Sequence, residues 1–92
     1  MSERKRERLE VIYDILSTIR SKNNSIKPTR LMQACNLSTP MFKQYIDELT
    51  KKGFLIEVIN DKGQKFYSLQ DHGFRFLEQY QKIVTFIKDF GL

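Results

Sequence analysis

Near the start of the chain, apolar residues recur at spacings of three, one, three and three residues, which place them on one face of a helix. These residues are Leu9, Ile12, Tyr13, Leu16 and Ile19. The pattern predicts a helix from about residue 4 to residue 21 that packs this face on the core. The polar residues 22–25 end the pattern.

A second, shorter helix is predicted from Pro28 to about Asn36. The fixed φ of proline suits the first turn of a helix, and asparagine tolerates the left-handed conformation that often ends one. Residues 25–27, just before the proline, can add a short strand.

A third helix is predicted from the sequence Ser38-Thr39-Pro40, because a hydroxyl side chain followed by proline is a typical helix start. The helix runs to about Lys52 and stops at Gly53. Lys51 and Lys52, just before the glycine, lie near the negative end of the helix dipole, where basic residues are favourable.

After Gly53 the pattern becomes that of strands. Residues 54–59 are mostly apolar and rich in β-branched side chains, 60–63 form a turn, and 64–69 alternate, so we expect a β-hairpin. A last helix covers about residues 71–90. The prediction is an α+β fold, mainly α: a winged helix-turn-helix domain over residues 1–70 and a C-terminal dimerisation helix, antiparallel or coiled-coil, over 71–92.

The predicted third helix has one apolar and one polar side. Phe42, Ile46 and Leu49 share the side that packs on the core. The opposite side is centred on four residues and flanked by Met41 and Lys43; the four are Pro40, Gln44, Asp47 and Lys51. A helix with a free polar side fits the major groove of DNA.

The polar side offers a specific role for each residue type. Gln44 suits a bidentate bond to adenine, and Met41 and Thr39 suit contact with a thymine methyl group. Lys43 and Lys51 suit phosphates. An acid at this surface, Asp47, fits DNA only if it is held away from phosphate or reads a cytosine amine.

The remaining candidate DNA contacts are basic residues outside this helix. Arg30, at the start of the second helix, is a phosphate candidate because the helix N-terminus adds its own N–H groups. Lys62 and Lys65 lie at or beside the tip of the hairpin, where a wing touches the DNA backbone. An ordinary solvated turn is the alternative for these two lysines, since Asp61 partly cancels their charge.

The charge is concentrated in one half of the chain. Lys and Arg total 16 and Asp and Glu total 11, a net charge of +5. Residues 1–52 hold 11 bases and 6 acids, whereas 53–92 hold 5 of each, so the whole excess lies in the first half. This asymmetry points to a polyanionic partner such as nucleic acid, or less often a membrane surface; a solubilising surface is the alternative.

The order of these features resembles archaeal winged-helix regulators. The residues that carry the resemblance are Asn36-Leu37-Ser38, Phe42, Tyr45-Ile46, Leu49, Gly53-Phe54-Leu55, Tyr67-Ser68-Leu69, Gly73 and Phe76-Leu77. The chain is most similar to the small ten-kilodalton chromatin-associated DNA-binding proteins of archaea, over about residues 9–92. The resemblance implies binding of double-stranded DNA by a homodimer that forms through the C-terminal helix. Gln70 stands where this family commonly has a threonine cap.

The last helix supports a dimer independently of the resemblance. Apolar residues recur along it at the spacings four, three, four and three, typical of a coiled-coil seam: Phe76, Tyr80, Ile83, Ile87 and Phe90. A neighbouring strip, Phe74, Leu77 and Val84, is expected to pack on the winged domain. The alternative is that the whole apolar surface folds back onto the first helix of the same chain.

The sequence offers little for catalysis. It has one His and one Cys and no glycine-rich phosphate loop, so we expect no enzyme, metal or cofactor, and no small-molecule ligand. Cys35 is interpreted as a core residue rather than a redox sensor, and His72 as a surface residue rather than a pH sensor. No apolar run is long enough to span a membrane, and no secretory signal follows Met1, so we expect a cytoplasmic protein. The predicted binding of DNA adds the expectation that it is nucleoid-associated.

Two functions follow. The first is a DNA-binding homodimer that acts as a transcription regulator or as a chromatin architectural protein. The second is a winged-helix module that binds other proteins and no nucleic acid. The basic cluster of Arg4-Lys5-Arg6 and Arg8 is either an arm that contacts DNA or a frayed terminus, and the adjacent Glu3, Glu7 and Glu10 favour the terminus.

Overall fold

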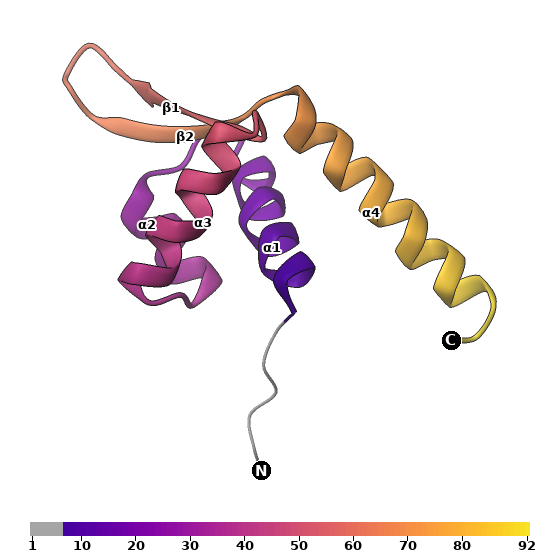
Figure 1. Ribbon diagram of the computed structural model, residues 1–92. Helices are drawn as coiled ribbons and strands as arrows, with labels where there is room; N and C mark the ends of the chain where they lie inside the picture. The colour runs from indigo at the N-terminus through magenta and orange to yellow at the C-terminus, as the bar shows by residue number, and fades with distance from the viewer. Residues whose placement is uncertain (1–6) are drawn as a thin grey trace.

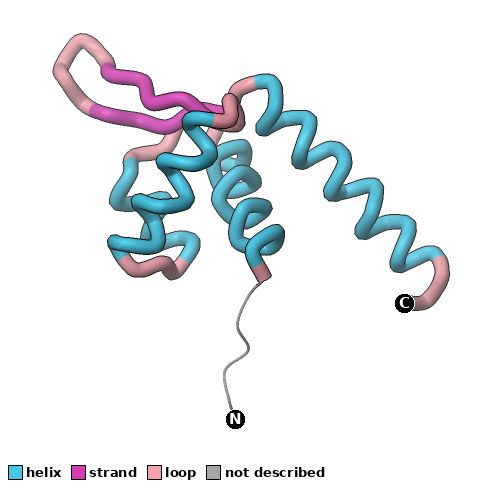
Figure 2. Tube along the Cα trace, viewed as in Figure 1, coloured by secondary structure: helices cyan, strands magenta, loops and turns pink. Residues whose placement is uncertain are grey.

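The computed structural model describes residues 7–92 as four helices and one hairpin. The elements are α1 (Arg8–Ser21), α2 (Pro28–Cys35), α3 (Thr39–Lys51), β1 (Leu55–Ile59), β2 (Lys65–Leu69) and α4 (Asp71–Asp89). Helices α1 to α3 form one body, the hairpin extends from its upper edge, and α4 slants away from α1 toward the C-terminus (Figure 1, Figure 2). The predicted fold class is confirmed. Arg4, Lys5 and Arg6 of the basic cluster lie outside the described residues, and its last member, Arg8, begins α1.

Helix α1 supplies the largest share of the core. Its buried residues are Val11, Ile12, Ile15, Leu16 and Ile19. The predicted core position of Leu9 is wrong, because this side chain is 58% exposed. Leu9 has the right helical phase for burial. It lies, however, in the first turn of α1, where it lines a groove beside α4.

The ends of α2 and α3 follow the local chemistry of their residues. Asn36 ends α2 in the left-handed conformation, with φ of 54°. Ser38 caps α3, and its hydroxyl accepts a hydrogen bond from the Met41 amide at 3.4 Å. Gly53 has φ of 79°, a conformation that glycine adopts without strain, and the chain turns there from α3 into β1.

The hairpin is joined to the helices at its root. Strands β1 and β2 pair antiparallel from Leu55↔Leu69 to Ile59↔Lys65. The expected short strand before α2 is present as one bridge, in which Ile26 and Tyr67 exchange backbone hydrogen bonds. The Asn24 side chain adds another link, since its oxygen accepts a bond from the Leu69 amide at 2.6 Å.

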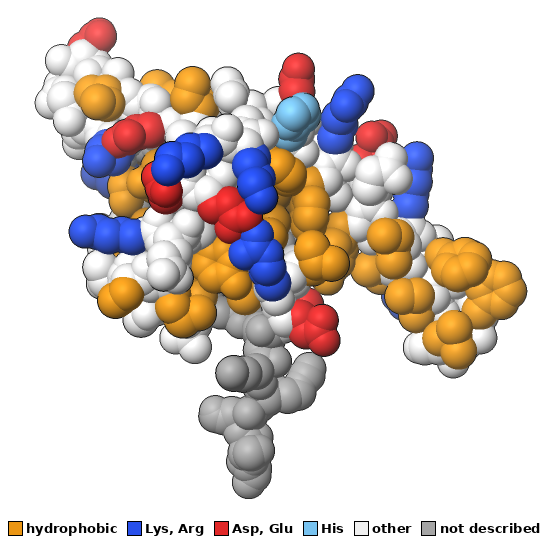
Figure 3. All heavy atoms as spheres, in the orientation of Figure 1, with side chains coloured by type: hydrophobic (Ala, Val, Ile, Leu, Met, Phe, Trp, Pro, Cys, Tyr) orange, Lys and Arg blue, Asp and Glu red, His pale blue; other side chains and the backbone are white. Residues whose placement is uncertain are grey.

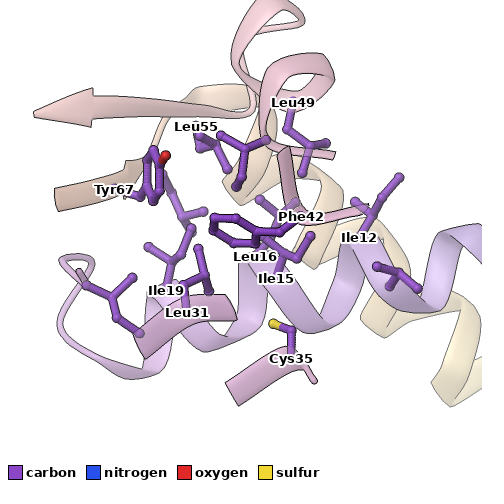
Figure 4. Close-up of a cluster of buried hydrophobic side chains, with 14 of the residues drawn as sticks. Ile12, Ile15, Leu16, Ile19, Leu31, Cys35, Phe42, Leu49, Leu55 and Tyr67 are labelled. Carbon is purple, nitrogen blue, oxygen red and sulfur yellow. The ribbon is translucent and has the colours of Figure 1, made fainter. Parts of the chain in front are cut away.

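The core lies where all these elements meet. In Figure 4 the side chains of α1 point toward Phe42, Leu49 and Tyr67, which come from α3 and the hairpin. Cys35 joins this cluster at 2% exposure, so its interpretation as a core residue is confirmed. Burial of such a cluster is the main stabilising term for a domain of this size.

The first half of α4 packs on this body. Leu77 is buried, as expected, but Phe74 remains 44% exposed. Tyr80 stacks on Tyr13 of α1 with ring centroids 4.4 Å apart, and Phe76 meets Phe54 edge-on at 5.9 Å. The first two residues of the predicted seam, Phe76 and Tyr80, therefore pack against residues of the same chain. None of the helices within residues 7–92 has the length and apolar character needed to cross a bilayer.

Candidate nucleic-acid interface

Helix α3 is held by one side and leaves the other side open. Phe42, Ile46 and Leu49 are buried, and the Phe42 ring meets Tyr67 of the hairpin edge-on at 6.3 Å. The residues predicted to face DNA are all exposed: Thr39, Pro40, Met41, Lys43, Gln44, Asp47 and Lys51. The predicted division of the helix into a packed and a free side is confirmed.

The first turn of α3 is fixed by its neighbours. Besides the Ser38 cap, the Thr39 hydroxyl lies 3.7 Å from the sulfur of Met32 in α2 and donates to it. Met41, in the same turn, is 44% exposed. The N-terminal residues of α3 are thus presented on a turn that α2 supports.

The candidate basic residues fall into two groups. Lys51 pairs with Asp47 at 3.1 Å, and Lys65 pairs with Glu57 at 2.7 Å, which raises the pKa of the Lys65 ammonium. Lys43, Arg30 and Lys62 are exposed and form no ion pair with any residue in 7–92. Figure 3 shows basic and acidic side chains next to one another over α3. The second group is the one whose charge is uncompensated.

A further charged cluster was not apparent from the sequence. Glu48 of α3 forms ion pairs with Arg8 of α1 and with Lys52, the latter at 2.8 Å. Arg8 also lies over the ring of Tyr45, 5.9 Å from its centroid. The hydrogen bonds from Arg8 and Lys52 lower the pKa of the Glu48 carboxyl from 4.5 to about 2. No spacing rule links residues forty positions apart, so only the fold reveals this tie between α1 and α3.

The tip of the hairpin is held by one side chain. The side-chain oxygen of Asn60, Oδ1, accepts hydrogen bonds from the backbone amides of Lys62 and Gln64, each at 2.9 Å. The Lys62 side chain projects from this turn. Farther back, Ile56, Val58 and Ile59 of β1 are at least 40% exposed, so the wing carries an apolar surface as well as a cation.

The other singled-out residues do not form a reactive site. Within residues 7–92, no three His, Cys, Asp or Glu side chains gather as a metal ion requires. His72 is exposed, as predicted, and its Nδ1 lies 3.0 Å from the carbonyl oxygen of Lys52. Its ring also meets Phe54 edge-on, so His72 links the end of α3 to the start of α4.

The chain resembles proteins of known fold over most of its length. Sso10a-2, a DNA-binding protein from Sulfolobus solfataricus, superposes with a TM-score of 0.72 at 20% identity and covers 92% of this chain and 85% of its own. A mutant of MarR from E. coli, solved with operator DNA, superposes with a TM-score of 0.70 at 21% identity. That match covers 79% of this chain and 53% of MarR.

An archaeal sequence is also related. The uncharacterized protein MJ0290 of Methanocaldococcus jannaschii is 30% identical over 83 residues, which are 90% of this chain. The chain spans only 36% of the length of that relative. A family model described as "Winged helix-turn-helix" matches residues 5–88. These matches confirm the resemblance to archaeal winged-helix proteins, and the chain belongs to the winged helix-turn-helix family.

Proposed function

We propose that this protein binds double-stranded DNA as a homodimer and acts as a transcription regulator or a chromatin architectural protein. In this proposal α3 lies in the major groove and the wing, residues 60–65, lies near the DNA backbone. Two proteins of similar fold support it by what they bind: Sso10a-2 is a DNA-binding protein, and MarR was solved with operator DNA.

The observation that carries the proposal is the open side of α3. A helix whose polar side is exposed along its whole length, and whose apolar side is fixed to a core, matches the width of the major groove. Three of the candidate cations, Arg30, Lys43 and Lys62, form no ion pair within residues 7–92, and they come from α2, α3 and the wing. Contacts from three elements would fix the register of the protein on the duplex.

The proposed roles separate base contacts from phosphate contacts. Gln44 reads adenine, while Met41 and Thr39 meet thymine methyl groups. Arg30, Lys43 and Lys62 bind phosphates. Lys51 and Lys65 join them by exchanging an exposed carboxylate for a phosphate, an exchange that costs little because exposed ion pairs are weak.

The proposed dimer forms through α4. Phe76 and Tyr80 begin the seam inside the chain, and Ile83, Ile87 and Phe90 continue it where α4 leaves the body. Two copies joined there present two α3 helices, whose separation sets the spacing of the DNA half-sites.

The test is fluorescence anisotropy of a labelled random duplex at several salt concentrations. We expect affinity to fall steeply with salt, because each neutralised phosphate releases counterions. The double variant Arg30→Ala/Lys43→Ala should weaken binding. It should also reduce the slope of log affinity against log salt concentration by about two, one for each phosphate contact removed. The control Arg75→Ala/Lys82→Ala removes the same charges from exposed positions on α4 and should bind like the wild type.

The outcomes also separate the architectural role from the regulatory one. Tight binding to the random duplex favours an architectural protein, and weak but salt-sensitive binding favours an operator-specific regulator. Equal loss in the test and control variants would show that net charge, and not this surface, governs binding.

The exposed apolar surface of the wing favours one alternative, a module that binds another protein. Ile56 and Val58 point to the same face of the hairpin as Phe66, which pairs with Val58 across the strands. Absence of DNA binding even at low salt would favour this alternative.

A further inference from the structure

Helix α4 carries one apolar stripe, of which only the first half is covered. Phe76, Leu77 and Tyr80 are in contact with α1 and Phe54. The stripe continues through Ile83 and Ile87 to Phe90, which are 59%, 40% and 66% exposed. Figure 1 shows the reason, since α4 diverges from α1 and its second half stands away from the body.

A groove opens where the two helices diverge. We call it the α1–α4 groove; it has a volume of about 580 Å³ and is lined by Glu7, Leu9, Glu10, Tyr80, Ile83, Val84 and Ile87. Its floor is apolar and comes from both helices, while the two carboxylates lie on the α1 side. Leu9, which has no place in the core, belongs to this groove.

The width of the exposed stripe indicates more than one neighbouring helix. At 100° per residue, Val84, Ile87, Ile83 and Phe90 cover an arc of roughly 120°, and Phe86 extends it. A seam between two helices is narrower than this, because it uses two positions in seven. A partner helix on α4 alone would therefore leave part of the stripe exposed.

From this geometry we propose that the last turn of α4 in a second copy docks in the α1–α4 groove, so that α1 forms part of the dimer interface. The proposal rests on the proposed dimer through α4 and adds to it a second helix and an orientation. When the apolar stripes of two α4 helices cross antiparallel between Ile83 and Ile87, Phe90 of one copy lies opposite Tyr80 of the other. Phe90 then enters the groove beside Leu9 of the other copy.

The charges of the groove and of the docked segment are complementary. Glu7 and Glu10 line the groove. The last turns of α4 carry Lys88, which lies one turn after Val84 at the edge of the stripe, and Asp89, which at 100° per residue lies on the opposite side of the helix. The second copy thus brings a cation to an acidic rim. Such pairing favours the correct orientation of the two helices.

The exposed apolar area is of the size that an interface requires. Leu9, Ile83, Phe86, Ile87, Phe90 and Leu92 are each 40% or more exposed. A half-exposed side chain of this size offers roughly 100 Å². Together they make up most of the about 800 Å² that each partner buries in a specific interface. Figure 3 shows apolar side chains gathered over the end of α4.

The first test is sedimentation velocity on the whole chain and four variants. Leu9→Lys and Ile83→Lys place a charge in the groove, and each should raise the dimer Kd about tenfold or more. The controls Ile59→Lys on the wing and Thr85→Lys on the polar side of α4 place the same charge at exposed positions and should dimerise like the wild type. Unchanged circular dichroism shows that the variants remain folded.

The variants distinguish this proposal from the dimer on which it rests. Loss of the dimer in Ile83→Lys but not in Leu9→Lys would overturn the role of α1 and leave the α4 dimer in place. A wild-type chain that stays monomeric at about 100 μM would overturn both.

A cross-link tests the orientation directly. Mixing the Leu9→Cys chain with the Phe90→Cys chain under mild oxidation should give a disulfide between the two, and Cys35 does not interfere because it is buried. A Leu9→Cys chain mixed with Thr85→Cys is the matched control and should not cross-link. Equal cross-linking in both mixtures, or none with Phe90→Cys, would overturn the proposed docking.

Discussion

Helices α3 and α4 are both amphipathic, but α3 leaves its polar side exposed, whereas the second half of α4 leaves its apolar side exposed. Helix α3 buries Phe42, Ile46 and Leu49, so apart from Met41 its free surface is polar and charged. Helix α4 buries Gly73 and Leu77 and half-buries Phe76 and Tyr80, so its second half exposes apolar side chains. Figure 3 shows the two surfaces on one view, with charges over α3 and apolar groups over the end of α4.

The difference indicates what kind of partner each helix takes. An exposed polar helix on a rigid support is suited to a hydrated, charged partner such as DNA. An exposed apolar stripe is costly to leave in water and is suited to another apolar helix. In the proposed function, one chain therefore separates DNA recognition by α3 from assembly through α4, according to the side that each helix exposes.

The largest expected effect comes from Gly73→Ala, which disturbs the attachment of α4 and leaves α3 unaltered. A Cβ at this position would collide with the Phe54 carbonyl oxygen, a backbone atom that cannot move aside easily. We expect a loss of about 3 kcal/mol in the free energy of unfolding, at the upper end of overpacking effects. Urea denaturation measures it. Glu78→Ala, on the exposed side of α4, is the control and should change stability by less than about 0.5 kcal/mol.

Next in size are two variants that separate base reading from phosphate binding. Gln44→Ala should reduce the free energy of binding to a preferred sequence by about 1–3 kcal/mol and should change binding to random DNA little. Arg30→Ala should weaken binding to every duplex alike and reduce the salt slope by about one. Competition binding with a randomised duplex library measures both. Equal effects of the two variants on all sequences would contradict the assigned roles.

A smaller effect, of opposite sign, is expected from Asp47→Asn. The change removes the one acid centred on the free side of α3 and releases Lys51 from its ion pair. We expect DNA affinity to increase about two- to five-fold at low salt, since exposed pairs are worth less than about 1 kcal/mol. The increase should vanish at high salt, where such charges are screened. Reduced affinity would instead indicate that Asp47 contacts a base.

The smallest effect concerns the tie between α1 and α3. Because the folded pKa of Glu48, about 2, lies below its ordinary value of 4.5, its ionisation stabilises the fold above about pH 4.5. This contribution is lost as the pH falls from about 5 to 2. Thermal melts across this range should show a flatter pH dependence for Glu48→Gln than for the wild type. Glu78→Gln, whose side chain has no ion pair within residues 7–92, should melt like the wild type.

Local patterns predicted the elements well, because each depends on neighbouring residues. The Ser38 cap, the left-handed Asn36 and the turn at Gly53 lie where the sequence indicated. Contacts between distant segments had no such signal. Arg8–Glu48 and Tyr13–Tyr80 join residues that no periodicity relates. Periodicity gave Leu9 the phase of a core residue, but it does not show where the neighbouring helices stop.

The root of the hairpin has a consequence for its motion. Asn24 and the Ile26–Tyr67 bridge fasten β2 to the loop before α2, whereas the tip beyond the Ile59↔Lys65 pair is held by hydrogen bonds within its own turn around Asn60. The hairpin is therefore a rod fixed at one end, stiff where it meets the helices and free to bend farther out. Hydrogen exchange should be slow at the amides of Tyr67 and Leu69 and should quicken toward Gly63. In the proposed complex with DNA, a wing of this kind can follow the varying width of a groove while α3 keeps its place.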